Sequence, residues 1–283
     1  MRILLLGYKG QLGNEFFKIL GSQKNIELTA LDIADLDVTN RQDLLKIVNQ
    51  KAYDVILNCT AYNNVDMAEE NPELAYKVNY YAIRNLTDAA NVNQSLLVHY
   101  STDYVFSGQG RLKRMVYDER KPISKYGKSK KYGEDLLREL TDKYLLIRTS
   151  WLFGETQDSF VVKLINWSKE TKEIELIQDQ ISSPTYAYDL AIATLNLIKA
   201  EVHGTFHVTN TPVSKLEWGK YILNKISWDG QIHGVNMSSL NLKAKRPKYS
   251  VLDNSDYKIV CNEDLPSWKD ATDRFLDQIL EVK

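Results

Sequence analysis

The feature that most constrains the fold is a glycine-rich turn near the start of the chain. The apolar run at residues 2–6 predicts a buried strand, and Gly7, Gly10 and Gly13 follow it at G-x-x-G-x-x-G spacing ahead of a helical pattern. Strand, glycine turn and helix in this order are typical of a dinucleotide-binding βα unit. The glycines let the backbone approach a pyrophosphate, and the helix N-terminus supplies free N–H groups. We therefore expect this part of the chain to bind a dinucleotide.

Acidic residues follow the second predicted strand, at residues 27–31. Asp32 lies about 20 positions after the glycines, where a carboxylate typically binds the ribose hydroxyls of a dinucleotide. Its charge would repel a 2′-phosphate, which favours NADH; a turn or helix cap is the alternative interpretation. Asp37 and Val38 are expected to flank the adenine.

Apolar runs and helical patterns alternate through the first half of the chain. This alternation predicts the α/β class, with a Rossmann-type, doubly wound parallel sheet. Strands are expected at residues 2–6, 27–31, 54–58, 96–101 and 144–149, with one long helix over 72–90. We expect residues 1–150 to form the NAD(P)-binding domain, with later elements near 175–210 returning to it. Residues 151–283 should form mainly a smaller C-terminal α/β substrate-binding lobe.

A Tyr-x-x-x-Lys pair after the fourth strand is the candidate catalytic pair. On a helix, Tyr126 and Lys130 lie one turn apart on the same face. A nearby ammonium should lower the pKa of the tyrosine from its usual value of about 10. Such a tyrosine can deliver a proton to a carbonyl oxygen near neutral pH. Solvated helix residues are the alternative interpretation.

Two other pairs share this spacing, Tyr117/Lys121 and Tyr221/Lys225. Lys121 precedes a proline and is biased away from helix, and no strand ending in hydroxyl groups precedes Tyr221. The pair that we favour follows a strand with such an end. There, Thr102 is expected to hold the carbonyl oxygen by a hydrogen bond.

Composition excludes several classes of function. The net charge of −1 implies no nucleic acid and no anionic membrane as partner. Cys59 and Cys261 give neither a disulfide framework nor zinc spacing. No apolar run approaches the roughly 18 residues that span a bilayer, and the N-terminal run indicates a strand rather than a signal peptide. We expect a cytoplasmic protein that acts on a small molecule.

Motifs run along almost the whole chain. They are Gly-Gln-Leu-Gly at 10–13, Asn-Cys-Thr-Ala-Tyr-Asn-Asn-Val-Asp at 58–66, Ser-Thr-Asp-Tyr-Val-Phe at 101–106, Tyr-Gly-Lys-Ser-Lys at 126–130, Arg-Thr-Ser-Trp-Leu-Phe-Gly at 148–154, Asp-Gln-x-x-x-Pro-Thr at 179–185 and Arg-Pro-x-x-Ser-x-Leu-Asp at 246–253. Together they resemble the extended short-chain dehydrogenases/reductases, and within that family the subgroup that reduces a dTDP-4-keto-6-deoxysugar.

The resemblance implies that NADPH or NADH reduces the 4-keto group of dTDP-4-dehydro-β-L-rhamnose, the last step of dTDP-L-rhamnose synthesis. The implied catalytic residues are Thr102, Tyr126 and Lys130. The implied cofactor-binding residues are Gly7, Gly10, Gln11, Leu12, Gly13, Asp32, Asp37, Val38, Ala61, Tyr62, Asn63, Asn79, Tyr126 and Lys130. The implied substrate-binding residues are Val65, Thr102, Asp103, Tyr126, Trp151 and Arg246.

In this scheme, hydride reaches C4 of the sugar while the proton of Tyr126 reaches the oxygen. Lys130 binds the ribose and biases the tyrosine, and Thr102 steadies the developing alkoxide. Trp151 offers an apolar face to the deoxysugar, and Arg246 suits the diphosphate. Without the resemblance, a core tryptophan and a surface arginine are the alternatives for the last two.

The family also bears on assembly and on competing functions. Some relatives dimerise through a metal ion bound by carboxylates. Glu15 is a suitable ligand, but Tyr188 stands where a second acidic ligand is expected, so we predict no metal. We expect a monomer or a homodimer. Asn63, often Thr in the family, and the basic loop 110–119 make the exact sugar less certain than the reaction. The alternatives are a 4-ketoreductase or epimerase for another nucleotide sugar, or a non-catalytic regulatory subunit that binds sugar nucleotides.

Overall fold

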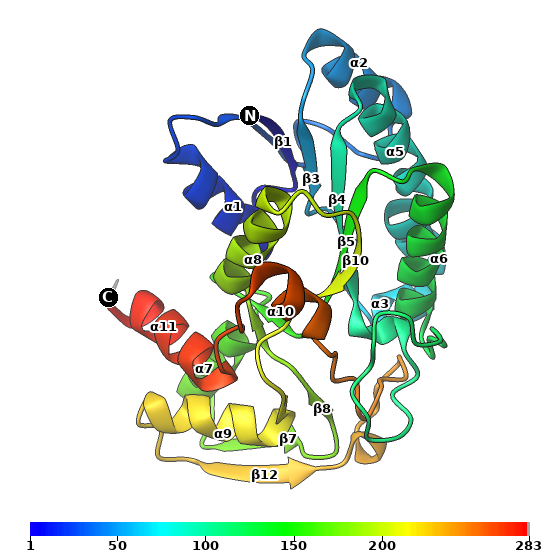
Figure 1. Cartoon of the computed structure of the whole chain (residues 1–283). Coiled ribbons are helices and arrows are strands. Elements are labelled where there is room, and N and C mark those ends of the chain that lie inside the picture. The colour runs from blue at the N-terminus through cyan, green and yellow to red at the C-terminus, as the bar shows by residue number, and fades with distance from the viewer. Residues whose placement is uncertain (282–283) are drawn as a thin grey trace.

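A six-stranded parallel sheet forms the larger half of the molecule (Figure 1). The structure is a computed structural model that describes residues 1–281. In sheet order the strands are β10 (Gly204–His207), β5 (Tyr144–Thr149), β4 (Leu96–Thr102), β3 (Val55–Asn58), β1 (Arg2–Leu6) and β2 (Glu27–Leu31). Every pairing is parallel. The predicted α/β fold with a doubly wound parallel sheet is confirmed.

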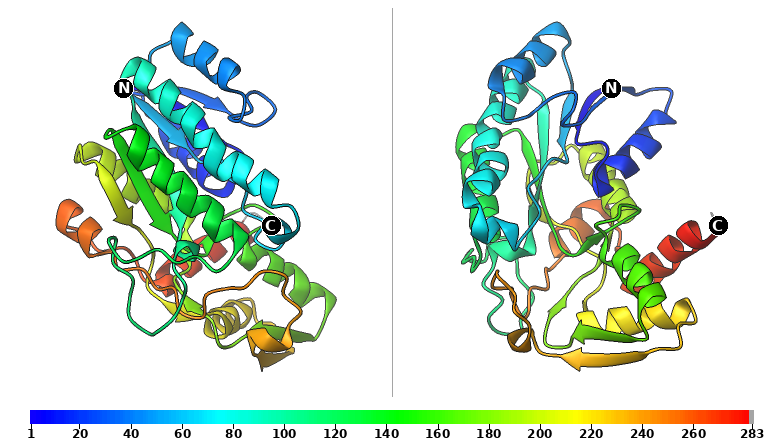
Figure 2. Two further views of the ribbon diagram at one scale, coloured as in Figure 1. Left: turned by 90° about the vertical axis from the view of Figure 1, so that its right-hand side faces the viewer. Right: turned by 180° about the vertical axis from the view of Figure 1, so that it is seen from behind.

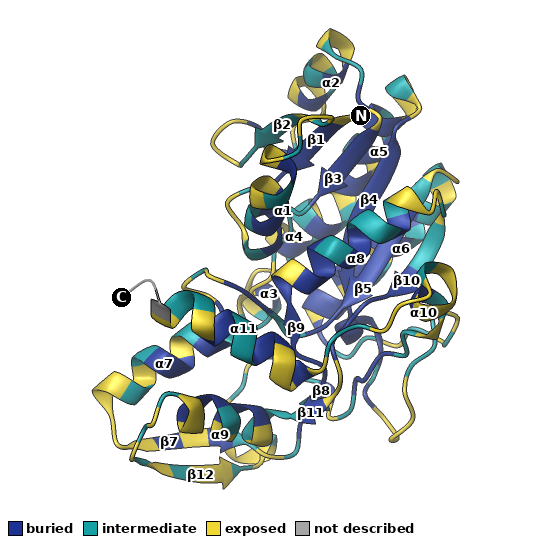
Figure 3. Cartoon of the chain, turned by 60° about the vertical axis from the view of Figure 1, so that its left-hand side comes forward, coloured by how far each residue is buried: buried dark blue, intermediate teal, exposed yellow. Residues whose placement is uncertain are grey.

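Helices cover both faces of this sheet, and the left view of Figure 2 looks onto one of the two layers. One layer has α1 (Gln11–Gly21), α8 (Ala187–Lys199) and α10 (Ser255–Cys261); the other has α2 (Arg41–Gln50), α5 (Ala82–Asn93) and α6 (Lys125–Leu140). Strand β1 shows why both layers are needed. Ile3 and Leu5 pack into one core and Leu4 and Leu6 into the other, each no more than 1% exposed. Figure 3 shows that the inner strands β1, β3, β4 and β5 are almost entirely buried, whereas the edge strand β2 is not.

The helix expected over residues 72–90 is interrupted. The run begins as α4 (Pro72–Tyr76), with proline at its first turn, passes through the π-helical turn η1 (Lys77–Tyr81) and continues as α5 to Asn93. The prediction of one uninterrupted α-helix is therefore wrong. A π turn leaves no mark in the apolar periodicity, because its neighbours keep the helical pattern. The turn packs against α6, where a Cβ on Gly133 would lie only 2.1 Å from the Asn79 carbonyl oxygen.

A smaller lobe lies beyond one end of the sheet (Figure 1). Its elements are α7 (Phe160–Glu170), α9 (Lys215–Lys225), α11 (Trp268–Glu281), the parallel pair β7 (Glu173–Ile177) and β12 (Gln231–Val235), and the short strands β6 (Leu152–Phe153), β8 (Ile181–Ser182), β9 (Thr185–Tyr186) and β11 (Val213–Ser214). A separate core around Phe153, Trp218 and Phe275 holds it together. Strand β12 and helix α10 were not predicted from the sequence.

Within residues 1–281, no helix combines the length and the apolar character needed to cross a bilayer. Cys59 and Cys261 are free thiols.

Candidate active site

A cavity of about 320 Å³ opens at the carboxyl ends of the central strands. Segments that follow β1, β3, β4 and β5 line it together with the start of α6. The predicted site residues that it brings together are Gly10, Gln11, Leu12, Ala61, Asn63, Val65, Thr102, Asp103, Tyr126, Lys130 and Trp151. Ligands collect at such strand ends in open parallel sheets. The remaining predicted residues lie behind or beside the cavity.

The glycine turn between β1 and α1 suits a pyrophosphate. Gly7 has a φ of +80°, in the left-handed region, and a Cβ on Gly13 would lie 2.1 Å from the Gly7 carbonyl oxygen. Gly10 caps α1 without a side chain, and the first turn of α1 carries no acidic residue. The first turn of α1 therefore adds no negative charge of its own beside its free N–H groups, which suits an anion. The buried Oε1 of Gln11 has no hydrogen-bond partner among the described residues.

Asp32 closes this turn. Its carboxylate accepts hydrogen bonds from the backbone N–H groups of Lys9, at 2.9 Å, and Ile33, at 2.8 Å. These bonds match the cap interpretation, and they leave the carboxylate beside the glycine turn. Asp37 accepts a bond from the Thr39 N–H at 2.8 Å, while the side chain of Val38 is buried in the core under α2.

Tyr126 and Lys130 lie on the first turns of α6, which Ser124 caps through the Gly127 N–H. A Cβ on Gly127 would lie 2.3 Å from the Tyr104 carbonyl oxygen, so glycine lets α6 start directly against the 3-10 turn η2 (Asp103–Val105), which follows β4. This contact brings Tyr126 beside Thr102. Both members of the pair are buried, and the Lys130 Nζ donates to the Tyr100 carbonyl at 2.8 Å.

The prediction that Lys130 lowers the pKa of Tyr126 is wrong for this structure. Burial raises the pKa of the Tyr126 phenol above its usual value; a hydrogen bond with Thr102 acts the other way but does not reverse the shift. Burial also lowers the pKa of Lys130 to about 8, against the opposing charge of Glu134. The phenol is therefore protonated at neutral pH, as a proton donor must be, and Lys130 stays mostly charged.

Asp103 is a buried carboxylate held by hydroxyl groups. Thr102 Oγ1 donates to its Oδ1 at 3.0 Å, and Ser182 Oγ donates to its Oδ2 at 3.1 Å, as does Ser250 Oγ. Burial raises the pKa of Asp103 to about 6, although the three hydroxyl bonds act to lower it. The sequence analysis missed Ser182 and Ser250 as site residues, even though both lie inside motifs that carried the family resemblance.

Asn79 lies beneath the cavity wall rather than in it. Its amide pairs with both the N–H and the C=O of Tyr62, at 2.9 and 3.0 Å, and donates to Ser129 Oγ at 3.0 Å. The amide is thus fully used by the protein. Asn79 holds the segment of Ala61 and Tyr62 in place and is not itself positioned to bind a cofactor.

Trp151 and Arg246 mark the side of the cavity that faces the lobe. Trp151 has a φ of +42°, unusual for a residue with a side chain, and its ring stacks on Trp218 with centroids 6.1 Å apart. Arg246 is ion-paired with Asp66 through two contacts of 2.6 and 3.2 Å. The guanidinium predicted for the diphosphate is thus already paired within the protein.

Comparison with known proteins assigns the family. The sequence profile of the RmlD substrate binding domain matches residues 1–281. The chain belongs to this family. It is 34% identical over 265 residues to the dTDP-4-dehydrorhamnose reductase of Aggregatibacter actinomycetemcomitans, covering 89% of this chain and 90% of the relative.

Solved structures of the RmlD family agree with this assignment. A dTDP-4-dehydrorhamnose reductase from Clostridium acetobutylicum superimposes with a TM-score of 0.95 at 36% identity, covering 99% of this chain and 100% of that one. One from Bacillus anthracis, in complex with NADP, has a TM-score of 0.95 at 34% identity, covering 98% and 99%. A Thermus thermophilus UDP-glucose 4-epimerase, at 16% identity and a TM-score of 0.82, shares the fold alone.

The other two Tyr-x-x-x-Lys pairs have different surroundings from the pair in the RmlD-family cavity. Tyr117 is 80% exposed. The hydroxyl of Tyr221 and the ammonium of Lys225 both bind Asp273 on α11, which ties α9 to that helix. Of the three pairs, Tyr126 and Lys130 alone border the cavity.

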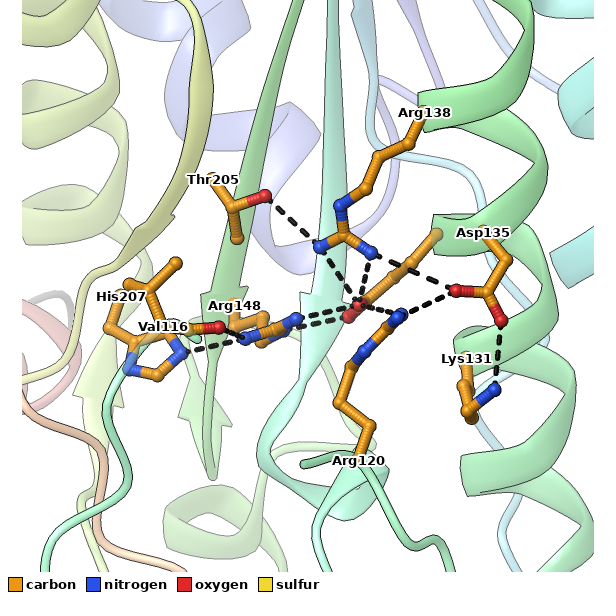
Figure 4. A network of polar contacts seen from close by, with 9 residues as sticks. Val116, Arg120, Lys131, Asp135, Arg138, Arg148, Thr205 and His207 are labelled. Carbon is orange, nitrogen blue, oxygen red and sulfur yellow. Dashed lines mark hydrogen bonds and ion pairs between the residues drawn. The ribbon is translucent and has the colours of Figure 1, made fainter. Parts of the chain in front are cut away.

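A buried ion-pair network behind α6 was missed by the sequence analysis (Figure 4). Glu134, one turn beyond Lys130, receives two bonds from Arg148 of β5, at 2.9 and 2.8 Å. Arg120 and Arg138 approach the same carboxylate. Burial alone would raise the pKa of Glu134, but these partners, Arg148 first, hold it at about 2. The network fixes the back of α6 against the sheet, and so fixes the height of Lys130 in the cavity.

Proposed function

We propose that this protein reduces the 4-keto group of dTDP-4-dehydro-β-L-rhamnose with NADPH or NADH, giving dTDP-L-rhamnose. The observation that carries the proposal is that the glycine turn, at Gly10, and the trio Thr102, Tyr126 and Lys130 line one cavity. A dinucleotide on the turn would reach the trio from one side, which leaves the lobe side for the sugar. The names of the relatives, and the NADP complex of the Bacillus anthracis structure, support both parts.

The glycine turn is the proposed holder of the cofactor. Gly10, Gln11 and Leu12 would bind its pyrophosphate through backbone N–H groups, with Gly7 and Gly13 allowing the close approach. The carboxylates of Asp32 and Asp37 would lie toward the adenosine end, and Ala61, Tyr62 and Asn63 would lie toward the nicotinamide end. When bound, the cofactor supplies the hydride for the reduction.

The chain's own part in the chemistry is the movement of one proton. Tyr126 holds that proton on its phenol because burial raises its pKa, and it releases the proton to the sugar oxygen. A hydrogen bond from Thr102, which acts to lower the pKa of Tyr126, stabilises the phenolate left behind. Lys130, one turn further along α6, would hold the ribose of the cofactor. Burial excludes bulk water from these steps, which strengthens each electrostatic contact.

The sugar is proposed to lie between Val65, Asp103 and Trp151, with residues 151–283 acting mainly as the substrate-binding lobe. Trp151 would present a ring face to the deoxysugar. We further propose a cytoplasmic site of action, because the substrate is a soluble nucleotide sugar, and a monomeric or homodimeric enzyme.

The decisive experiment measures oxidation of NADPH and of NADH with dTDP-4-dehydrorhamnose generated in situ. Wild type should turn over, and Tyr126→Phe should lose at least about 10²-fold in kcat, because the proton donor is gone. Tyr117→Phe, an exposed tyrosine of a second Tyr-x-x-x-Lys pair, is the matched control and should keep wild-type activity. A folded wild-type protein that binds the cofactor but reduces none of this substrate would refute the proposal.

A further inference from the structure

Lys215 is a cation held by aromatic rings at the edge of the lobe. It is the first residue of α9, and its Nζ lies 3.6 Å from the ring centroid of Phe160, 4.5 Å from that of Trp151 and 5.2 Å from that of Trp218. Cation–π contacts attract the ammonium, but a ring face is a weak hydrogen-bond acceptor. The N–H donors of Lys215 are therefore left largely unused.

The charge of Lys215 also has no counter-ion. Across residues 1–281, no carboxylate and no hydrogen-bond acceptor is paired with its Nζ. Glu217, the acidic residue of the same helical turn, is exposed and makes no ion pair with it. A cation at a helix N-terminus is disfavoured by the helix dipole. Burial and the charge of Arg246 lower the pKa of Lys215 to about 7. In the free protein the charged form of Lys215 is therefore destabilised, and a bound anion would stabilise it.

The position of Lys215 relative to the cavity indicates which anion could reach its ammonium. Its ring partner Trp151 borders the cavity, and the Lys215 N–H donates to the carbonyl of Gln180 at 3.0 Å. A cavity of about 320 Å³ is at the small end for a ligand site. A nucleotide attached to the sugar must therefore extend past Trp151 over the lobe, since the opposite side belongs to the glycine turn. Arg246, the other cation on this side, is already paired with Asp66.

We propose that Lys215 binds the diphosphate of the nucleotide sugar, with Phe160, Trp151 and Trp218 holding its ammonium in place for the phosphate oxygens. The inference rests on the proposed function for the identity of the sugar nucleotide, and it assigns the phosphate contact to Lys215 in place of Arg246. A lysine binds phosphate as a compact charge and needs no fixed fork, so the rings supply the orientation.

The test uses Lys215→Met, which removes the charge but keeps an unbranched side chain that packs well against aromatic rings. Isothermal titration calorimetry measures binding of dTDP and of thymidine to the full-length protein. We expect Lys215→Met to weaken dTDP binding by about tenfold or more, the effect of one lost charge-assisted bond, and to leave thymidine binding unchanged. Lys220→Met, an exposed lysine of the same helix, is the matched control and should change neither.

In turnover assays the KM of Lys215→Met for the nucleotide sugar should rise by the same factor as its dTDP affinity falls. Its kcat and its KM for NADPH should stay within about twofold of wild type.

The outcomes separate this inference from the proposed function. Unchanged dTDP binding by a folded Lys215→Met protein, or no dTDP binding by wild type, overturns the inference. A wild type that reduces no dTDP-4-dehydrorhamnose, combined with weakened dTDP binding by the variant, overturns the proposed function only. If Lys215→Met does not fold, Lys215→Gln and Lys215→Arg replace it. The inference then requires that arginine keep dTDP affinity within about threefold and glutamine lose it.

Discussion

At the scale of single residues, the position of one hydroxyl proton decides how Thr102 acts. An ionised carboxylate can only accept, so Thr102 must donate its proton to Asp103 in the arrangement seen here. The same oxygen accepts a hydrogen bond from the Tyr104 N–H at 3.1 Å. The single hydroxyl proton can therefore reach the Tyr126 phenolate only by leaving Asp103, and in that orientation the bond with Thr102 lowers the tyrosine pKa. The direct hydrogen bond to the sugar oxygen that the family resemblance implies stays a prediction, and the contacts of Thr102 add a link between Asp103 and Tyr126.

The raised pKa of Asp103 makes the stability of the fold depend on pH. The folded-state value of about 6 lies above the ordinary value of 3.8, so the protonated form favours the fold below about pH 4. That contribution is lost as the pH rises through about 6, and two pKa units correspond to about 3 kcal/mol. Relative to Asp103→Asn, wild type should lose about 2–3 kcal/mol of unfolding free energy between pH 4 and pH 7. Urea unfolding at several pH values measures this.

The exposed residue Asp142 makes no side-chain ion pair or hydrogen bond within residues 1–281 and provides the control. The difference between wild type and Asp142→Asn should stay flat over the same range. A flat difference for Asp103→Asn as well would show that the buried carboxylate titrates normally.

The sequence predicted the chemistry-bearing residues that lie in local patterns, and it missed the partners that folding brings from afar. Thr102, Tyr126 and Lys130 were recognisable because they follow a strand or share a helix turn. Ser182 and Ser250 reach Asp103 across 79 and 147 positions, and no local pattern encodes such separations. The predicted direction of the Tyr126 pKa shift was wrong for the same reason, because the burial that raises this pKa depends on the whole fold.

At the scale of elements, the cavity depends on how closely α6 approaches its neighbours. Gly127 lets the start of α6 touch the turn η2 after β4, and Gly133 lets its middle touch η1. The five strands predicted for the first half of the chain agree with β1 to β5 within a residue at each end, because their apolar runs are strong. Helix α10 is short, β12 has few buried residues, and η1 differs from α-helix only in its hydrogen bonds, so none of the three was predicted.

Gly133→Ala tests the contact between α6 and η1. Alanine favours helix over glycine by about 1 kcal/mol, but its Cβ would lie 2.1 Å from the backbone oxygen of Asn79. Overpacking of this kind costs about 1–3 kcal/mol, and a rigid backbone atom places the cost at the upper end. We expect a net loss of about 1–2 kcal/mol in chemical denaturation, with reduced kcat because Asn79 positions Tyr62.

Gly21→Ala is the matched control, since a Cβ there meets nothing within 4 Å. It should leave stability unchanged or raise it by up to about 1 kcal/mol. Equal effects of the two alanines would mean that the close approach at Gly133 does not constrain the fold.

At the scale of the whole molecule, one segment fastens the lobe to the sheet. Lys243 pairs with Glu70, the Ala244 N–H donates to Asp66 at 2.9 Å, and Ser250 reaches Asp103. The ion pair of Arg246 with Asp66 is part of the same attachment. These contacts hold the lobe against the part of the chain that lines the cavity, so we expect them to affect substrate binding without touching the substrate.

This arrangement predicts that Arg246 acts through Asp66. Asp66→Asn and Arg246→Gln should each weaken dTDP binding modestly and by a similar factor, because either change breaks the same partly exposed pair. The double variant should then bind dTDP no more weakly than either single variant, as expected for two residues that act as a unit.

A phosphate-binding Arg246 would give a different pattern. Arg246→Gln would lose far more dTDP affinity than Asp66→Asn, and Asp66→Asn would free the guanidinium and so keep or strengthen binding. Calorimetric titration of dTDP into the three variants distinguishes the two cases. Equal single effects, together with a large effect of Lys215→Met, would mean that the diphosphate is held by the lysine among the aromatic rings while the arginine holds the lobe in place.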